Sequence, residues 1–369
     1  MVWRAYDEGV FSVGDGPAYE PWKDWHSAKS EGPMALVRAA ILAANPHNTQ
    51  PWRFRVTPSR IDLFADTTRR IGTIDPYLRE MYIGLGCSVE NLLLAAAANG
   101  YRPALALLPD PSDENHAARI ELSAGARSES DLYRAIPQRH TNRHPYRKDR
   151  PISTEVLDAL KSLAEAETDV TVFWFASADD RGRVGDLIVQ ATEAIIADTE
   201  QSVDSEKWYR FKWKDLQHYR DGITLDTAGV PGPLLVFAKM LPRQSREADD
   251  RQWLKNTRDN HVATAAAFGI LAVRDADDRA QRMRCGRAWQ RMHLWATTQS
   301  LAMQPLNQVP EREARERVLG IEPRFGKAVH SLVGGSDCQP LMMFRAGYPT
   351  RDAQRSPRRS VEEVVIGRS

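Results

Sequence analysis

The sequence predicts an α+β fold of two related halves, each a mainly antiparallel, partly mixed sheet wrapped by helices. Three observations lead to this prediction. Short alternating segments typical of strands occur on both sides of long apolar helical stretches. Two of these stretches, residues 86–100 and 286–300, have the same length, begin with glycine and precede a proline, Pro103 or Pro305. Strands and helices follow both stretches in a similar order, which favours a duplicated unit over a chance match.

In the first half, Thr57-Pro58-Ser59 separates two alternating segments, which is typical of a hairpin. Residues 82–100 carry apolar side chains at helical spacing, and Gly100 is suited to end that helix. We therefore expect helices at 34–44 and 82–100, and strands at 52–56, 60–65, 104–108 and 118–122.

The second half repeats this alternation of apolar strands and amphipathic helices. Residues 200–251 differ, because their aromatic residues are mixed with charges without a clear period, which indicates an insertion folded against another part of the chain. Residues 1–30 also lack periodicity and are expected to form an arm. Expected helices lie at 132–137, 154–166, 179–197 and 275–299, and expected strands at 170–175, 266–273 and 341–346.

Composition excludes several classes of protein. The chain has 369 residues, 42% apolar and 27% charged, with a formal net charge of +1, which argues against general attraction to nucleic acids or membrane surfaces. We see no apolar run near the ~20 residues of a membrane span and no secretory signal. The three cysteines are far apart, so neither a disulfide framework nor a metal site is expected, and a cytoplasmic location is predicted.

A polar turn at residues 45–54 separates the first helix from the hairpin. Proline fixes φ and disfavours helix in the residue before it, so Asn45-Pro46 should end the helix. The turn that follows presents amides, a hydroxyl and the imidazole of His47 in one place. By itself, this pattern is equally consistent with a local hydrogen-bond network and with the edge of a ligand site.

Two basic clusters could bind an anion. Arg139, Thr141 and Arg143 alternate, so in an extended segment they face the same way and could hold a phosphate and its polyol. A solvated basic loop explains the same residues, whereas nucleic-acid binding is the weaker alternative because the whole chain is almost neutral. Arg358 and Arg359 near the C-terminus could supply further positive charge, although basic tails are commonly just solvated.

Three segments together resemble the nitroreductase family of flavoproteins, most closely its Acg-like branch. They are Pro-His-Asn-Thr-Gln-Pro-Trp-Arg-Phe at 46–54, Arg-His-Thr-Asn-Arg-His-Pro-Tyr at 139–146, and the ending from 342 to 365 with Ser-Pro-Arg-Arg. The resemblance runs from about residue 34 to the C-terminus. It implies a nitroreductase-like fold in which two fused halves form a pseudo-dimer with one complete FMN site. The implied domains are an arm (1–30), a first half (31–130), a second half (131–199 and 252–369) and a lid-like insertion (200–251).

The resemblance also implies residue roles. Arg139 would hold the FMN phosphate, Thr141 a ribityl hydroxyl and Arg143 the N1/O2 edge of the flavin. A backbone N–H near Gln304 and Pro305 would lie close to flavin N5, although the family's usual glutamate-glycine is absent there. The remaining implied FMN contacts are Pro46, His47, Asn48 and Gln50 at the ring, and Arg358 and Arg359 at the phosphate.

The function implied is that of an FMN-dependent oxidoreductase. NAD(P)H or an organic donor would reduce the flavin, which would pass electrons to a nitro, quinone or other conjugated small molecule. His47 is the one candidate for a catalytic proton donor. The alternative role for its imidazole is a hydrogen bond to the flavin or within the turn. The alternative is an FMN-sequestering protein whose 200–251 lid closes the site. We expect no nucleic-acid or membrane partner, no metal, and either a monomeric pseudo-dimer or a homodimer.

Overall fold

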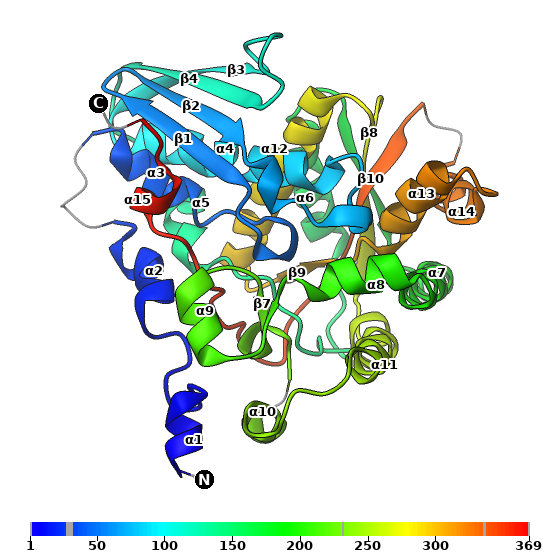
Figure 1. Cartoon of the computed structure of the whole chain (residues 1–369). Helices are drawn as coiled ribbons and strands as arrows, with labels where there is room; N and C mark the ends of the chain where they lie inside the picture. Colours follow the sequence, from blue (N-terminus) through cyan, green and yellow to red (C-terminus); the bar gives the residue numbers. More distant parts are fainter. Residues whose placement is uncertain (1, 27–31, 231, 335–336, 368–369) are drawn as a thin grey trace.

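The computed structural model describes residues 2–26, 32–230, 232–334 and 337–367 (Figure 1). Two four-stranded antiparallel sheets organise these residues, with strand orders β1-β2-β4-β3 and β5-β8-β10-β9. The predicted α+β class is confirmed. The first sheet contains β1 (Trp52–Thr57), β2 (Arg60–Ala65), β3 (Tyr101–Leu107) and β4 (His116–Ala124). The second contains β5 (Val170–Phe175), β8 (Ala267–Val273), β9 (Ala302–Pro305) and β10 (Gln339–Gly347).

Helices surround both sheets, and a short parallel pair, β6 (Tyr209–Arg210) with β7 (Ile223–Thr224), lies in the 200–251 segment. The first 140 residues contain α1 (Val2–Asp7), α2 (Glu20–Asp24), α3 (Met34–Ala40), α4 (Arg79–Ala98) and α5 (Asp131–Ala135). Then follow α6 (Thr154–Glu165), α7 (Ala178–Ala197), α8 (Thr199–Glu206), α9 (Trp213–Tyr219), α10 (Gly232–Met240) and α11 (Arg246–Asn256). The last are α12 (Arg279–Thr298), α13 (Gln308–Leu319), α14 (Arg324–Leu332) and α15 (Val361–Val364).

The two predicted repeat helices, α4 and α12, pack directly against each other at their glycines. A Cβ on Gly86 would lie 2.0 Å from the carbonyl oxygen of Met283, and a Cβ on Gly286 would lie 1.9 Å from that of Ile83. The two contacts therefore join equivalent positions of the repeat, 83 with 286 and 86 with 283. Only residues without a Cβ allow backbones to approach this closely.

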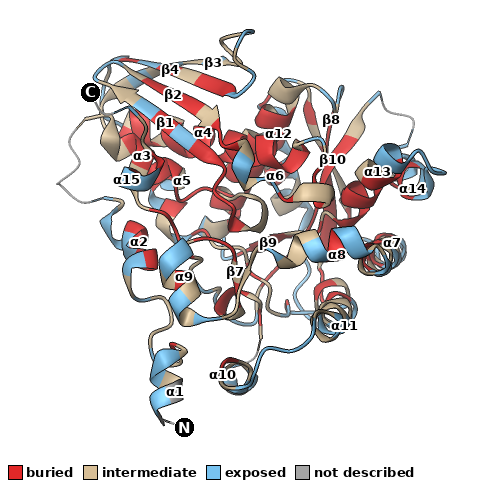
Figure 2. Cartoon of the chain, in the orientation of Figure 1, coloured by how far each residue is buried: buried red, intermediate tan, exposed pale blue. Residues whose placement is uncertain are grey.

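The packing of the α4–α12 pair determines how the sheets and the other helices are layered. The first sheet packs on α4, while the second sheet has α12 on one face and α7, α13 and α14 around the other. Strand β8 is accordingly buried along its whole length, and its apolar sequence has no polar alternation. Figure 2 shows this buried band running through α4, α12, β8 and β10, with exposed surface on the outer helices.

The C-terminal tail crosses from the second sheet to the first. After β10, the chain returns to the edge of the first sheet, where Ile366 N–H donates to Phe54 O (2.8 Å) and α15 packs on α3 and β1. Val361 and Val364 are buried there. The basic pair Arg358 and Arg359 precedes α15, so this crossing carries it to the turn that follows α3.

Several predicted details differ from the structure. The first helix ends at Ala40 rather than 44, because residues 41–44 already form the approach to the turn. The 200–251 segment holds four helices, and β9, α13 and α14 were not predicted. Helix α4 is long and apolar enough to cross a bilayer, contrary to the sequence-based expectation, but 83% of its most apolar window is buried inside the fold. The domain boundaries remain predictions.

We predict that Gly286→Ala lowers the free energy of unfolding by about 3 kcal/mol, because its methyl group would meet backbone that cannot move without separating α4 and α12. Urea denaturation would measure the loss. Gly182→Ala is the control, since this α7 glycine has open space around it and the change should stabilise by about 0.5–1 kcal/mol. Equal stability of the Gly286→Ala variant and the parent would contradict the packing role.

Candidate functional site

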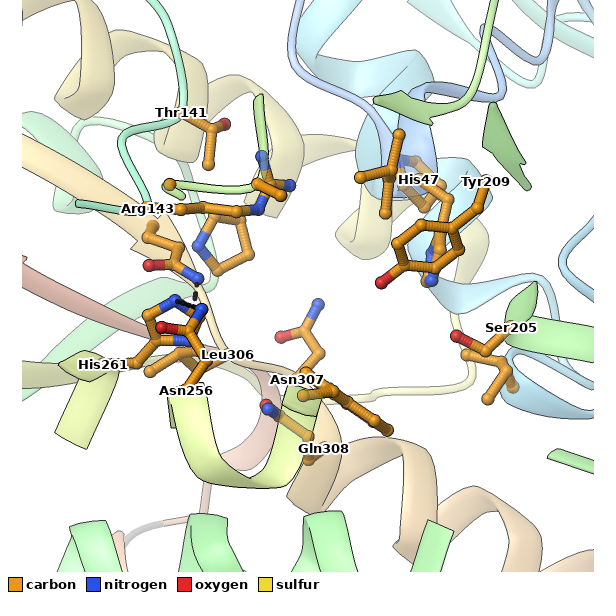
Figure 3. Close-up of a pocket in the computed structure, with 18 of the residues that line it drawn as sticks. His47, Thr141, Arg143, Ser205, Tyr209, Asn256, His261, Leu306, Asn307 and Gln308 are labelled. Carbon is orange, nitrogen blue, oxygen red and sulfur yellow. Dashed lines mark hydrogen bonds between the residues drawn. The ribbon is translucent and has the colours of Figure 1, made fainter. Parts of the chain in front are cut away.

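A cavity of about 410 Å³ is lined by residues of α4, of α12 and of the 200–251 segment, among others. Its wall contains the turn at Asn45–His47, the first turns of α4, Thr141 and Arg143, both strands of the β6–β7 pair, α11, and the junction of β9 with α13. Figure 3 shows Arg143 and Thr141 on one side of this space, with His47 and Tyr209 across from them.

A smaller polar hollow of about 50 Å³ adjoins this cavity. The two share Thr141 and Arg143 in their walls. The hollow is also lined by Arg139 and Arg358, so the structure brings together the two basic clusters that the sequence separates by more than 200 residues. Asn48 lies at this hollow rather than in the wall of the larger cavity.

The turn before β1 has an unusual backbone. His47, Asn48 and Gln50 have φ of 47°, 56° and 52°, in the left-handed region that non-glycine residues rarely adopt. Each such residue costs roughly 1–3 kcal/mol unless its surroundings impose it. The carboxamide of Asn45 helps to do so, since its Oδ1 accepts from Gln50 N (2.8 Å).

The 200–251 segment and the C-terminal tail also hold this turn. Asn48 Nδ2 donates to Gly222 O (3.1 Å) and to Pro357 O (2.9 Å). Gln50 Nε2 donates to Arg220 O (2.8 Å), while its Oε1 accepts from Arg359 N (2.8 Å). Gln50 and Arg359 thus lie outside the walls of both hollows and tie the turn to its neighbours.

The guanidiniums of Arg139 and Arg358 are each only 2% exposed. Within the described residues, their hydrogen bonds go to groups without a negative charge: Arg139 donates to Leu42 O (3.1 Å) and lies 3.5 Å from His293 Nδ1, and Arg358 donates to Asn48 Oδ1 and Ala43 O (3.2 Å). Burial lowers the pKa of Arg139 to about 10, and burial together with Arg139 lowers the pKa of Arg358 well below its usual value. The Nε atoms of both are buried without a partner. These donors fit a phosphate group, which would supply both the missing acceptors and the missing charge.

Arg143 is half-buried where the two hollows join, and it donates from Nη1 to Thr227 O (3.1 Å). Burial and the charge of Arg143 lower the pKa of His47 to about 4. His47 is therefore neutral near pH 7, which favours a hydrogen-bonding role over that of a proton donor.

The predicted residues Gln304 and Pro305 both line the larger cavity, at the end of β9. Gln304 Oε1 accepts from Arg345 Nε (2.8 Å), so a fully buried arginine fixes the orientation of this amide. His261 lies beside it, 3.5 Å from Gln304 Nε2, in the π-helical segment Thr257–Val262. Such segments are frequent at functional sites.

Sequence reasoning missed several wall residues. Glu80 and Glu311 lie in apolar or charged helices without a motif. Asn256 ends α11, and His261 belongs to the π-helical segment that follows, whose helical type has no sequence signal. Of Trp208, Tyr209 and Trp213 in the 200–251 segment, Tyr209 lines the cavity. The others pack elsewhere: the Trp208 ring lies 5.4 Å from the Arg69 guanidinium, and the Trp213 ring stacks on Tyr19.

No protein-family model matches the chain. A "Putative NAD(P)H nitroreductase" of Mycobacterium tuberculosis is 28% identical over 360 residues, which cover 95% of each chain. The "Putative NAD(P)H nitroreductase acg" of the same organism is 24% identical over 339 residues, covering 89% of this chain and 94% of the other. The predicted resemblance is confirmed. The chain is a relative of the Acg-like nitroreductases.

Solved nitroreductase structures match part of the chain. The FMN-dependent nitroreductase NfnB from Mycobacterium smegmatis, in complex with NADPH, is 18% identical with a TM-score of 0.35, covering 65% of this chain and 97% of that one. A "putative nitroreductase" from Desulfovibrio desulfuricans, in complex with FMN, is 14% identical with a TM-score of 0.34, covering 66% and 99%.

We predict that acid destabilises the protein well above the carboxylate range. The pKa of His47 is about 4 in the folded state against 6.5 ordinarily, so the unfolded chain binds more protons between these values. The free energy of unfolding is therefore highest above pH 6.5 and falls as pH drops towards 4. Burial lowers the pKa of His140, His261 and His293 in the same direction.

Urea midpoints at pH 7 and pH 5 would measure this loss of stability. His47→Asn should reduce the loss while tolerating the left-handed backbone, because asparagine adopts positive φ readily. His330→Asn, at an exposed position, is the control. An unchanged difference between the two pH values in the His47→Asn variant would contradict the contribution of His47.

Proposed function

We propose that the chain is an FMN-dependent oxidoreductase, with the FMN phosphate in the small basic hollow and the flavin ring in the larger cavity. The observation that carries this proposal is the pair of buried guanidiniums, Arg139 and Arg358, whose Nε atoms lack partners beside a cavity of about 410 Å³. FMN combines a phosphate with a large planar ring, so it matches both hollows. Bound FMN would supply the redox chemistry, while the protein supplies binding, orientation and electrostatics.

The side chains then have distinct tasks. Arg139 and Arg358 bind the phosphate, Thr141 binds a ribityl hydroxyl, and Arg143 lies at the N1/O2 edge of the ring, where a cation stabilises the reduced anionic flavin. Pro46, His47, Gln304 and Pro305 contact the ring from the cavity wall. Asn48, Gln50 and Arg359 act indirectly, because their hydrogen bonds hold the turn, the insertion and the tail together.

The reaction proposed is electron transfer from NAD(P)H or an organic donor, through flavin N5, to a nitro, quinone or similar small molecule. The names of the relatives, NAD(P)H nitroreductases, support this choice. Because the tail of the second half crosses to the turn of the first, one chain would complete one site. We propose a pseudo-dimer that is active as a monomer or homodimer in the cytoplasm.

A second candidate, an FMN-sequestering protein, is favoured by one observation. The 200–251 segment is fastened to the turn at several points: Asp221 pairs with Arg69, which itself donates to Thr49 O of the turn, Gly222 O accepts from Asn48, and Arg220 O accepts from Gln50. Tyr209 and Phe211 from this segment line the cavity. A lid held in this way would restrict access to a bound flavin.

We predict that Arg139→Ala reduces FMN occupancy at least tenfold, since it removes a buried charged donor worth about 1.5–3 kcal/mol. Flavin absorbance per chain after saturation and desalting measures the occupancy. The control is Arg324→Ala, which removes an arginine hydrogen-bonded to Gln190 and absent from both cavity walls. Full occupancy in the Arg139→Ala variant would exclude the phosphate assignment.

We also predict that NADPH or NADH bleaches the bound flavin within seconds under anaerobic conditions. Stopped-flow absorbance of the FMN-loaded protein measures this step. A flavin that stays oxidised with both nicotinamides, but is reduced by dithionite, would favour sequestration or a different donor.

A further inference from the structure

The N-terminal arm has no task in the function proposed so far, although part of it is buried against the C-terminal tail. Trp22 of α2 is 3% exposed, and its indole Nε1 donates to Ser356 O (2.8 Å). Earlier in the arm, Ala18 O accepts from the backbone N–H of Arg358 (2.7 Å). The arm is thus hydrogen-bonded on both sides of Pro357, within the segment that carries Arg358 to the small basic hollow.

The Trp22 ring also contacts the guanidinium of Arg358. The guanidinium carbon lies 5.0 Å from the centre of the indole ring, which is within the range of a cation–π interaction. The hydrogen-bond acceptors of this guanidinium in the described residues, among them Ser356 Oγ (2.7 Å), are all uncharged. The negative face of the indole ring therefore adds an attraction for this buried charge that the uncharged acceptors supply only weakly.

Trp22 reaches the other basic cluster as well. Its ring packs edge-on against His140, with 4.7 Å between the ring centres and 69° between the ring planes. His140 lies between Arg139 and Thr141 in the sequence and lines the same hollow. One buried indole therefore contacts both of the segments that are proposed to hold the phosphate group.

The other side of the arm is fixed by α9. Ala18 N donates to Gln217 Oε1 (3.0 Å), and Gln217 Nε2 donates to Asp15 O (2.9 Å). The Tyr19 ring stacks on Trp213, with 6.4 Å between the ring centres. The arm is therefore hydrogen-bonded to both α9 and the C-terminal tail (Figure 1). It cannot shift along the tail without breaking its contacts to α9.

We infer that Trp22 is a positioning residue for Arg358, and that the N-terminal arm is a functional part of the phosphate site. The indole N–H fixes the backbone of the tail at Ser356, and the ring face fixes the guanidinium that this backbone carries. The inference rests on the proposed function, because Arg358 is assigned there to the FMN phosphate. The arm then contributes to the affinity for FMN but not to the affinity for riboflavin, which has the same ring without the phosphate.

Fluorescence titration of the FMN-free full chain with FMN and with riboflavin tests this role. Trp22→Leu should weaken FMN binding at least about tenfold, since it removes a cation–π contact and a hydrogen bond. Riboflavin binding should stay unchanged. Trp25→Leu is the matched control, because it makes the same change in the same arm, where the ring packs on Tyr133 (5.2 Å between centres) and lines neither hollow. Unchanged FMN binding in the Trp22→Leu variant, or equal weakening of both flavins, would overturn the inference.

A more conservative variant covers the case in which Trp22→Leu does not fold. Trp22→Phe keeps a ring beside Arg358 and loses the N–H that is donated to Ser356 O. It should weaken FMN binding about fivefold and leave riboflavin binding unchanged. Urea denaturation shows whether each variant is folded under the conditions of the titration. Equal weakening of both flavins by Trp22→Phe would also contradict a positioning role.

Phosphorus NMR of the FMN-loaded full chain observes the phosphate group directly. At saturating FMN, Trp22→Leu, or Trp22→Phe in its place, should shift the phosphate resonance of the bound FMN, because the guanidinium beside the phosphate changes its position. The visible spectrum of the flavin ring should remain that of the parent. Trp25→Leu should change neither signal. A phosphate resonance that stays at the parent position in the Trp22 variants would count against the inference.

The parent chain separates a failure of this inference from a failure of the proposed function. A parent that binds riboflavin as tightly as FMN has no phosphate site, and this result would overturn both. A parent that prefers FMN, together with a Trp22→Leu variant that keeps the same preference, would overturn the inference alone.

Discussion

The close crossing of α4 and α12 is the constraint on which the remaining structure depends. At this crossing, Gly86 packs on the backbone of Met283, and Gly286 packs on that of Ile83. Backbone contact at equivalent positions relates the two helices by an approximate two-fold arrangement, which places one sheet beyond each helix. The cavity lies along the same pair, with wall residues from both helices. A side chain at either glycine would therefore disturb the sheets and the site together.

The site itself is organised at the expense of local stability. Two guanidiniums, Arg139 and Arg358, are buried at the same hollow, and the backbone of three residues, His47, Asn48 and Gln50, lies in the left-handed region. Neither feature would persist in an isolated segment. Hydrogen bonds from the insertion and the tail impose the turn, and a phosphate would offset the repulsion between the guanidiniums. The stability of the remaining fold thus offsets the cost of a site whose guanidiniums are already positioned to bind an anion.

Much of the fold could be predicted from the sequence where the local pattern agrees with the final environment. Strand β5 has the predicted bounds, and the hairpin β1–β2 and helices α4, α6, α7 and α12 lie within a few residues of theirs. That the 200–251 segment is an insertion stays a prediction. Its helices were not predicted, because aromatic and charged residues are mixed there without a clear helical period. Helix α13 was missed for a related reason: its buried face carries Glu311, Arg312 and Arg315 instead of apolar residues.

The candidate site also combines features that the local sequence determines with features that depend on tertiary packing. By itself, the sequence determined the residue types of the polar turn and of the two basic clusters, because proline, asparagine and arginine carry their local and chemical preferences wherever they lie. Only the tertiary structure decided which of them meet. It brought Arg139 and Arg358 to one hollow, directed Gln50 and Arg359 to each other, and placed Glu80 and Glu311 in the wall of one cavity. Such pairings depend on where α4 and α12 cross and where the tail returns, and no local sequence pattern encodes distances between segments hundreds of residues apart.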